Sequence, residues 1–138
     1  MLEFSSIVPV LRVADLSRSL AWYQEILGFT PEPLPAGGPL SSCRLHRDGT
    51  ELVLRRSASI AIATAPRLSA HGDWDVQIRL RGEQLVALLD QARRRTPLVR
   101  GPEVMPDGHV EFELEDPDGY RVCVAERLTD TRGIPRAV

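Results

Sequence analysis

The chain has 138 residues, a length typical of one domain, and 43% of them are hydrophobic, which is enough to build one core. Its formal net charge is −2, so the basic excess that usually accompanies nucleic-acid binding is missing. No segment reaches the roughly 18 consecutive apolar residues of a membrane span, and the first residues lack the pattern of a signal peptide. We therefore expect one cytoplasmic domain over residues 1–138, with no nucleic-acid or membrane partner.

The first predicted elements are a strand and a helix. Residues Ser6–Val13 are rich in Val, Ile and Leu, as strands are. Asp15 suits the N-cap of a helix, and Gly28 suits the position just after its last turn. Apolar residues between them recur at spacings of four, three and four, which places them on one helical face: Leu16, Leu20, Tyr23 and Leu27.

A hairpin is predicted to follow. The Pro- and Gly-rich stretch Pro31–Pro39 indicates an irregular connection. Two strands, Ser41–Arg47 and Thr50–Arg56, then meet at Asp48-Gly49, and Asp-Gly between apolar runs is a strong signal for a tight turn.

The second half repeats this order. An alternating strand, Asp75–Leu80, precedes a second helical face made of Leu85, Leu88, Leu89 and Ala92. Pro97 and the pair Gly101-Pro102 predict a loop. Alternation resumes over Val110–Glu115, and a turn leads to the last strand, which contains Val122 and Val124.

The chain therefore has the pattern of two βαβββ modules, over residues 6–56 and 73–127, joined by a linker over residues 57–72. We expect an α+β fold in which each sheet covers one face with its own helix. The other faces would form a curved mixed-sheet cup, and concave surfaces are where small ligands bind.

Two segments resemble known proteins. The segment Val8–Phe29, VPVLRVADLSRSLAWYQEILGF, is similar to the opening of glyoxalase and bleomycin resistance proteins, and Val110–Glu126, VEFELEDPDGYRVCVAE, is similar to their closing hairpin. The resemblance implies the vicinal oxygen chelate superfamily, which also includes extradiol dioxygenases. The opening resembles the bleomycin resistance branch most, which implies a homodimer that sequesters a drug without a metal. Because this fold carries many reactions, the resemblance does not decide the function.

Metal enzymes of this superfamily carry His or Glu on the first, fourth, fifth and eighth strands. When the superfamily's motifs are matched to this sequence, the resemblance implies that these positions correspond to Val8, to Arg55 or Val53, to Asp75 and to Cys123. Valine cannot ligate a metal, and arginine would repel one. We therefore expect neither a metal site nor any other cofactor.

Strand alternation divides the sheet residues between two faces. The core face is predicted to hold Leu52, Leu54, Val76, Ile78, Phe112, Leu114, Val122 and Val124. The opposite face, with Trp74 at its edge for stacking, supplies the predicted ligand-binding residues: Arg44, His46, Val53, Arg55, Trp74, Asp75, Gln77, Glu111, Glu113 and Cys123. An ordinary solvated sheet face is the alternative explanation for these polar side chains.

Two functions remain open at this point. The first is a metal-free protein that binds a small molecule and sequesters a drug or natural product. The second is a metal-independent isomerase, cyclase, lyase or hydrolase, with Asp75 or Glu113 as general base or Cys123 as nucleophile. Neighbouring arginines favour the charged form of a carboxylate and weaken it as a base, so binding is preferred.

Overall fold

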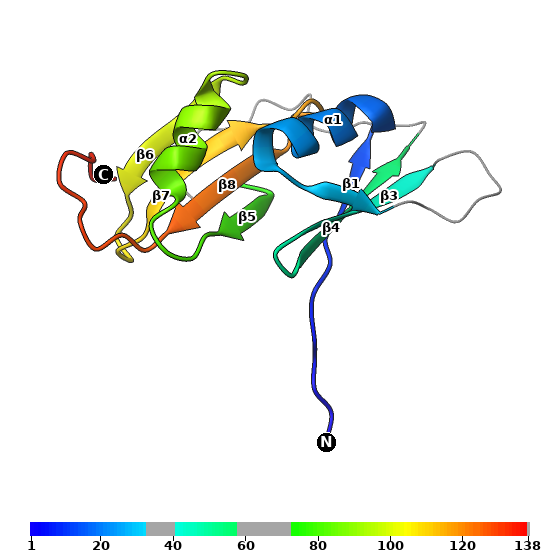
Figure 1. The fold of residues 1–138 in the computed structure, drawn as a ribbon, viewed down its shortest axis with the longest axis horizontal. Coiled ribbons are helices and arrows are strands. Elements are labelled where there is room, and N and C mark those ends of the chain that lie inside the picture. The colour runs from blue at the N-terminus through cyan, green and yellow to red at the C-terminus, as the bar shows by residue number, and fades with distance from the viewer. Residues whose placement is uncertain (33–40, 58–72, 138) are drawn as a thin grey trace. The chain divides into compact units, whose positions relative to one another are not determined.

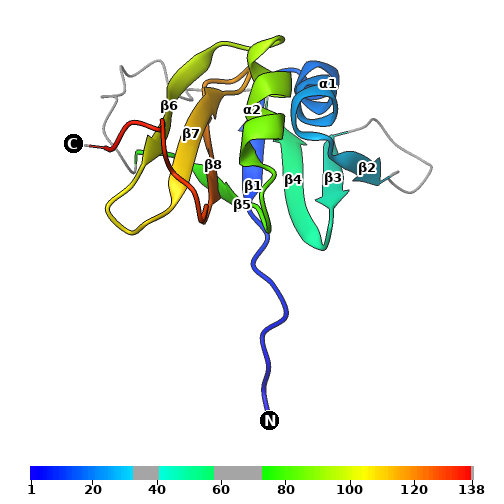
Figure 2. The same cartoon turned by 60° about the vertical axis from the view of Figure 1, so that its left-hand side comes forward.

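Within the residues that the structure describes, each half of the chain contains one helix and one four-stranded sheet (Figures 1 and 2). The structure is a computed structural model that describes residues 1–32, 41–57 and 73–137. The chain divides into two compact units, residues 1–61 and 62–138. The two units confirm the predicted α+β class and the repeated βαβββ order. Most of the predicted linker, residues 58–72, lies outside the described residues.

The first unit contains β1 (Val10–Val13), α1 (Leu16–Leu27), β2 (Thr30–Glu32), β3 (Ser42–Arg47) and β4 (Thr50–Arg56). Its sheet has the order β1-β4-β3-β2, in which β1 runs parallel to β4 and the other pairs are antiparallel. Two expectations were wrong. Strand β1 begins four residues later than predicted, and β2 occupies the start of the stretch expected to be irregular.

The ends of α1 form as the sequence predicts. The Asp15 side chain accepts a hydrogen bond from the Arg18 amide at 3.1 Å. Gly28 adopts the left-handed conformation with φ 69°, and its amide donates to the Gln24 carbonyl at 3.0 Å. The Asp48-Gly49 turn has φ 48° and 80°, so both residues take the positive values of a type I′ hairpin turn.

The second unit contains β5 (Val76–Arg79), α2 (Leu85–Arg93), β6 (Leu98–Val104), β7 (Val110–Glu115) and β8 (Arg121–Glu126). Its sheet has the order β5-β8-β7-β6, with β5 parallel to β8 and the other pairs antiparallel. Figure 2 shows α2 lying along this sheet, and it contacts β8.

Strand β6 was missed because its sequence contains Gly101-Pro102, which we interpreted as a loop. The strand tolerates this pair because its register with β7 shifts between Arg100 and Glu103. Gly101 has φ 86°, and a side chain there would collide with the Glu111 carbonyl oxygen. The glycine therefore permits both the irregular backbone and its close approach to β7.

The predicted core face is largely confirmed. Six of its eight members are at most 4% exposed: Leu52, Leu54, Phe112, Leu114, Val122 and Val124. Val76 and Ile78 are only half-buried, because β5 is the edge strand of its sheet. On the opposite face Glu111, Glu113 and Cys123 are also buried, so the centre of this sheet is covered on both sides and is no solvated face.

A distant carboxylate caps α2. Glu126, at the end of β8, is 1% exposed, and its two oxygens accept the Gln84 amide at 2.7 Å and the Leu85 amide at 3.1 Å. No side chain of the helix itself supplies a cap bond at this end. The carboxylate satisfies two of the amides that a helix start leaves without intrahelical partners.

A C-terminal segment beyond the predicted module lies along β6. The Val104 amide donates to the Pro135 carbonyl at 2.7 Å, and the Ala137 amide donates to the Val104 carbonyl at 2.8 Å. Val104 and Arg136 form a parallel bridge. This segment therefore hydrogen-bonds to backbone groups at the outer edge of β6. Across the described ranges, neither helix combines the length and apolarity that crossing a membrane requires.

Candidate functional site

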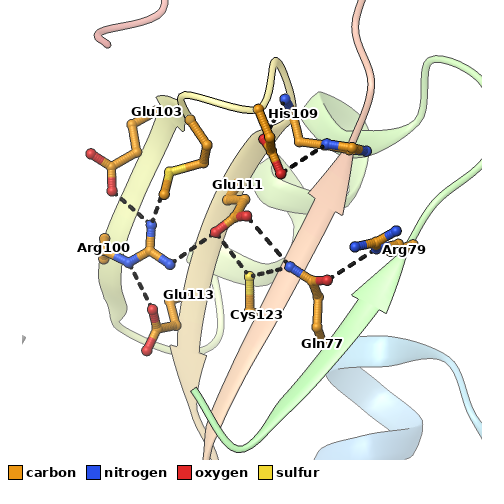
Figure 3. A network of polar contacts seen from close by, with 10 residues as sticks. Gln77, Arg79, Arg100, Glu103, His109, Glu111, Glu113 and Cys123 are labelled. Carbon is orange, nitrogen blue, oxygen red and sulfur yellow. Dashed lines mark hydrogen bonds and ion pairs between the residues drawn. The ribbon is translucent and has the colours of Figure 1, made fainter. Parts of the chain in front are cut away.

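One arginine on β6 holds three carboxylates together (Figure 3). Arg100 Nε donates to Glu113 Oε2 at 2.7 Å, Nη1 to Glu103 Oε1 at 2.7 Å, and Nη2 to Glu111 Oε1 at 3.1 Å. The Arg100 side chain is 9% exposed, and those of Glu111 and Glu113 are 7% and 5% exposed. Such burial makes the charge-assisted hydrogen bonds stronger than they would be at the surface. We call Arg100, Glu103, Glu111 and Glu113 the Arg100 cluster.

Hydrogen bonds continue from this cluster toward β5 through two uncharged side chains, those of Cys123 and Gln77. The Cys123 thiol donates to Glu111 Oε1 at 3.3 Å, and Gln77 Nε2 donates to Glu111 Oε2 at 3.4 Å. Gln77 Nε2 also lies 3.6 Å from the Cys123 sulfur, and its oxygen accepts from Arg79 Nε at 3.0 Å. Both oxygens of Glu111 are therefore engaged by protein groups.

Sheet register brings these residues to one face. Arg100 pairs with Glu113, Glu113 with Cys123, and Cys123 with Gln77, across all four strands of the second unit. Paired residues project on the same side of a sheet. The face lies opposite the buried Phe112 and Val124, which point to the core.

Burial and hydrogen bonding together shift the pKa values of Arg100 and Cys123. Burial alone would lower the pKa of Arg100, but its hydrogen bonds with Glu103, Glu113 and Glu111 reverse that effect and raise it above the ordinary value. Burial raises the pKa of the Cys123 thiol to about 12, and the nearby negative charge of Glu111 adds to this effect. At neutral pH the arginine is therefore charged and the thiol is not.

The charges of the Arg100 cluster do not balance. One guanidinium faces three carboxylates, so the four groups sum to −2 when all are ionised. Gln77 and the protonated thiol of Cys123 add no charge. Arg79, beyond Gln77, is exposed to solvent. The face therefore presents excess negative charge in a place where water screens it poorly.

The predicted residues of the first unit form a separate, exposed group. Arg44 makes an ion pair with Glu51, and its Nε lies 3.9 Å from Glu32 Oε2. His46 Nε2 lies 2.8 Å from the same Glu32 oxygen. The hydrogen bond with His46, joined by the charge of Arg44, holds the pKa of Glu32 below its ordinary value.

The remaining predicted residues take different places. Val53 is half-buried beside Arg44 in the sheet, and Arg55 is exposed. Trp74 is 36% exposed and lies just before β5. Asp75 accepts a hydrogen bond from the Arg121 amide at 2.8 Å, which extends the pairing of β5 with β8. Of the ten predicted ligand-binding residues, the structure thus gathers Gln77, Glu111, Glu113 and Cys123 around Arg100.

Sequence reasoning missed Arg100 and Glu103, because both lie on the strand that was interpreted as a loop. A signal was nevertheless present. Glu111, Glu113 and Glu115 alternate along β7, and such a row of like charges needs a nearby cation when its strand is buried.

The donors do not fit a divalent metal. On β5 and β8 the paired residues are Gln77 and Cys123, and a single thiol does not make a metal site. On β1 and β4 the pairs are Val10 with Val53 and Arg12 with Arg55. None of these pairs supplies the carboxylate or imidazole ligands that such sites need. Among the described residues, no three His, Cys, Asp or Glu side chains gather as metal ligands.

The hydrogen bonds of this site constrain two of the candidate catalytic groups. Cys123 lacks the thiolate that a nucleophile needs, and one oxygen of Glu113 is occupied by Arg100. The planar guanidinium of Arg100 holds the buried carboxylates of Glu111 and Glu113 in fixed positions.

Comparisons with known proteins agree with this fold. A sequence model of the Glyoxalase/Bleomycin resistance protein/Dioxygenase superfamily matches residues 5–124. No curated protein matches the chain. Among solved structures, TioX from Micromonospora sp. ML1 is 19% identical with a TM-score of 0.69, covering 91% of this chain and 100% of that one.

Two further solved structures are similar. The integron cassette protein VCH_CASS1 from V. cholerae is 20% identical with a TM-score of 0.67, over 93% of this chain and 99% of that one. The lactoylglutathione lyase from Agrobacterium tumefaciens is 20% identical with a TM-score of 0.65, over 88% and 93%. At these identities the likeness concerns the fold alone.

Proposed function

Because the chain belongs to the Glyoxalase/Bleomycin resistance protein/Dioxygenase superfamily, we propose that it binds a small organic cation without a metal. The Arg100 cluster carries this proposal, since its four ionic groups sum to −2. A ligand with an ammonium or other cationic group would compensate that charge. We expect the protein to sequester such a drug or natural product, as the resemblance to the bleomycin resistance branch implies.

Two xanthene dyes of similar shape and opposite charge test this proposal. Fluorescence polarisation should show that cationic rhodamine 6G binds at least about ten-fold more tightly than anionic fluorescein. Glu113→Gln should weaken rhodamine binding by about 10–100-fold, the range expected when a charged hydrogen bond is lost. Glu115→Gln on the same strand is the matched control, because Glu115 is half-exposed and pairs with Arg121 rather than Arg100. Equal binding of both dyes would contradict the proposal.

The alternative is a metal-independent enzyme acting on the same kind of ligand. Its support is the burial of Glu113, which is 3% exposed and could act as a general base in a dry site. Rates and affinities separate the two functions. For an enzyme, Glu113→Gln would abolish turnover of the natural ligand, whereas for a binding protein no turnover occurs in either form.

We also propose that the protein acts as a homodimer in the cytoplasm. The dimer is implied by the resemblance to bleomycin resistance proteins. The cytoplasm is supported by the two cysteines, Cys43 and Cys123, which are buried free thiols. Thiols stay reduced in that compartment. Light scattering at micromolar concentration checks the dimer, because a single chain has a mass of 15.3 kDa.

A further inference from the structure

The two oxygens of the Glu113 carboxylate differ in their contacts. Oε2 accepts a hydrogen bond from Arg100 Nε at 2.7 Å, whereas no group among the described residues donates to Oε1. Figure 3 shows this second oxygen on the side of the carboxylate away from Arg100, without a dashed line. The Glu113 side chain is only 5% exposed, so water has little access to it.

The neighbouring donors of the same sheet face are directed elsewhere. The Cys123 thiol, which pairs with Glu113 across the sheet, donates to Glu111 at 3.3 Å. One pair further along, Arg121 Nη2 lies 3.5 Å from Glu115 Oε2, and Arg121 Nε bonds to no described residue. Buried carboxylate oxygens normally accept hydrogen bonds, so Glu113 Oε1 lacks a donor that a ligand can supply.

We infer that Glu113 Oε1 accepts a hydrogen bond from a nitrogen of the bound cation. The inference rests on the proposed binding of a small organic cation and names the class of that ligand. It carries at least one N–H on its positive group, as protonated amines, amidines and guanidines do. Quaternary ammonium ions and other fully alkylated cations are discriminated against.

The charge of the Arg100 cluster does not by itself distinguish these two classes of cation. Four ionic groups that sum to −2 attract any cation that reaches them. An acceptor held away from water is different, because its desolvation costs free energy unless a donor replaces the water. An N–H supplies that donor, whereas an N-methyl group cannot. Arg100 also fixes the carboxylate in advance, so little ordering is needed when the ligand binds.

Glutamine at position 113 should present a donor where the carboxylate presents an acceptor. Arg100 Nε still requires an acceptor, so the amide oxygen should take the place of Oε2. The amide NH₂ then lies at the place of Oε1, where it can only donate. Glu111→Gln is the matched control, because it removes the same charge, and both oxygens of Glu111 are already engaged by protein donors.

Fluorescence polarisation with two cationic xanthene dyes tests the inference. Each nitrogen of rhodamine 6G carries a hydrogen and an ethyl group, whereas each nitrogen of tetramethylrhodamine ethyl ester carries methyl groups alone. The unmodified chain should bind rhodamine 6G about ten-fold more tightly, the effect of one hydrogen bond to a charged group. Glu113→Gln should bind the two dyes equally. Glu111→Gln should bind both more weakly and keep the ratio of about ten.

A second substitution separates the hydrogen bond from the charge at position 113. Glu113→Asp keeps the negative charge but withdraws the carboxylate by one methylene, so it should also lose the preference for rhodamine 6G. Each result is a ratio of two affinities measured on one protein sample, so a partly unfolded variant still reports it. A preference that survives in both Glu113 variants would overturn the assignment to this oxygen.

The anionic dye fluorescein distinguishes failure of this inference from failure of the proposed function. If the unmodified chain binds both cationic dyes equally, and both more tightly than fluorescein, selection for an N–H is overturned and the cation site stands. If all three dyes bind equally, both proposals are overturned. Loss of the preference in Glu111→Gln as well would assign it to the charge of the cluster and overturn the role of Glu113 Oε1.

Discussion

At the scale of single residues, Arg100 organises the candidate site. Its three nitrogen donors each contact a different carboxylate, with distances of 2.7 to 3.1 Å. A lysine could not do this equally well, because its ammonium lacks the planar fork of a guanidinium. Every carboxylate in the Arg100 cluster therefore contacts this one side chain.

Replacing this arginine should be costly. In Arg100→Met the carboxylates of Glu111 and Glu113 lose their buried countercharge, so the free energy of unfolding should fall by about 3–5 kcal/mol. Urea denaturation measures the change. Arg132→Met is the control, because that side chain is 92% exposed and pairs only at the surface with Asp130. Equal urea midpoints for the two variants would show that the cluster contributes nothing to folding.

The buried thiol of Cys123 should make stability depend on alkaline pH. Its pKa is about 12 in the folded chain, against about 8.5 for a thiol in water. The folded state therefore retains the proton longer, and this contribution is complete below about pH 8.5 and disappears as the pH rises to 12.

Cys123→Ser isolates this contribution. Between pH 9 and 12 the unfolding free energy of the parent should fall more steeply than that of the variant, by up to about 4 kcal/mol. Urea titrations at four pH values measure both slopes, and the variant retains the other groups that ionise in this range. Parallel slopes would mean that the Cys123 thiol ionises as readily in the folded state as in the unfolded one.

At this scale, strand alternation in the sequence predicted which side chains share a sheet face, whereas their role in binding stays a prediction. Gln77, Glu111, Glu113 and Cys123 were assigned to one face; Gln77, Glu111 and Cys123 hydrogen-bond to one another, and Glu113 joins them through Arg100. Arg100 was not found, because alternation fails where β6 shifts register. Hydrogen bonds that side chains accept from distant backbone amides also leave no periodic signal, so the bond from the Arg121 amide to Asp75 could not be anticipated.

At the scale of elements, the helices and hairpins were predicted better than the short strands. Caps and apolar spacing are local signals, and Asp15, Gly28 and the Asp48-Gly49 turn all acted as expected. The strand β2 has three residues and includes Pro31, so its sequence carries almost no strand signal. Such strands form because they hydrogen-bond to the edge of a neighbouring strand. The local sequence carries no signal of that pairing.

The core face of the second sheet can be tested by truncation. Phe112→Ala removes a ring that is 0% exposed, so the unfolding free energy should decrease by about 3–5 kcal/mol. Arg55→Ala is the comparison, because Arg55 is exposed on β4 and should change stability by about 0.5 kcal/mol or less. Thermal melts that coincide for the two variants would mean that the assignment of sheet faces is wrong.

Helix α2 should depend on the carboxylate that caps it. Glu126→Ala leaves the Gln84 and Leu85 amides without acceptors, so we expect a loss of about 2–3 kcal/mol. Glu126→Gln keeps one acceptor oxygen and should lose less. Glu83→Ala, an exposed carboxylate beside the same helix end, is the control. If Glu126→Ala unfolds at the same urea concentration as that control, the cap is dispensable.

At the scale of the whole molecule, the chemistry of the predicted ligand positions leads to a prediction about metals. The predicted ligand positions of this superfamily fall on Val8, on Arg55 or Val53, on Asp75 and on Cys123, and of these only Asp75 and Cys123 could ligate a metal. Elemental analysis of undenatured protein should therefore find well below one zinc, iron or nickel per chain, and a chelator should not change its melting temperature. One equivalent of any of these metals would refute this.

The cap on α2 also constrains the order in which the second unit can form. Gln84 and the carboxylate that accepts its amide are 42 residues apart. During synthesis, the first turn of α2 therefore leaves the ribosome long before its partner exists, and a nine-residue helix is marginal alone. The helix should become protected from amide exchange only when β8 joins the sheet, so the start of α2 and the end of the chain's last strand should open and close as one cooperative unit.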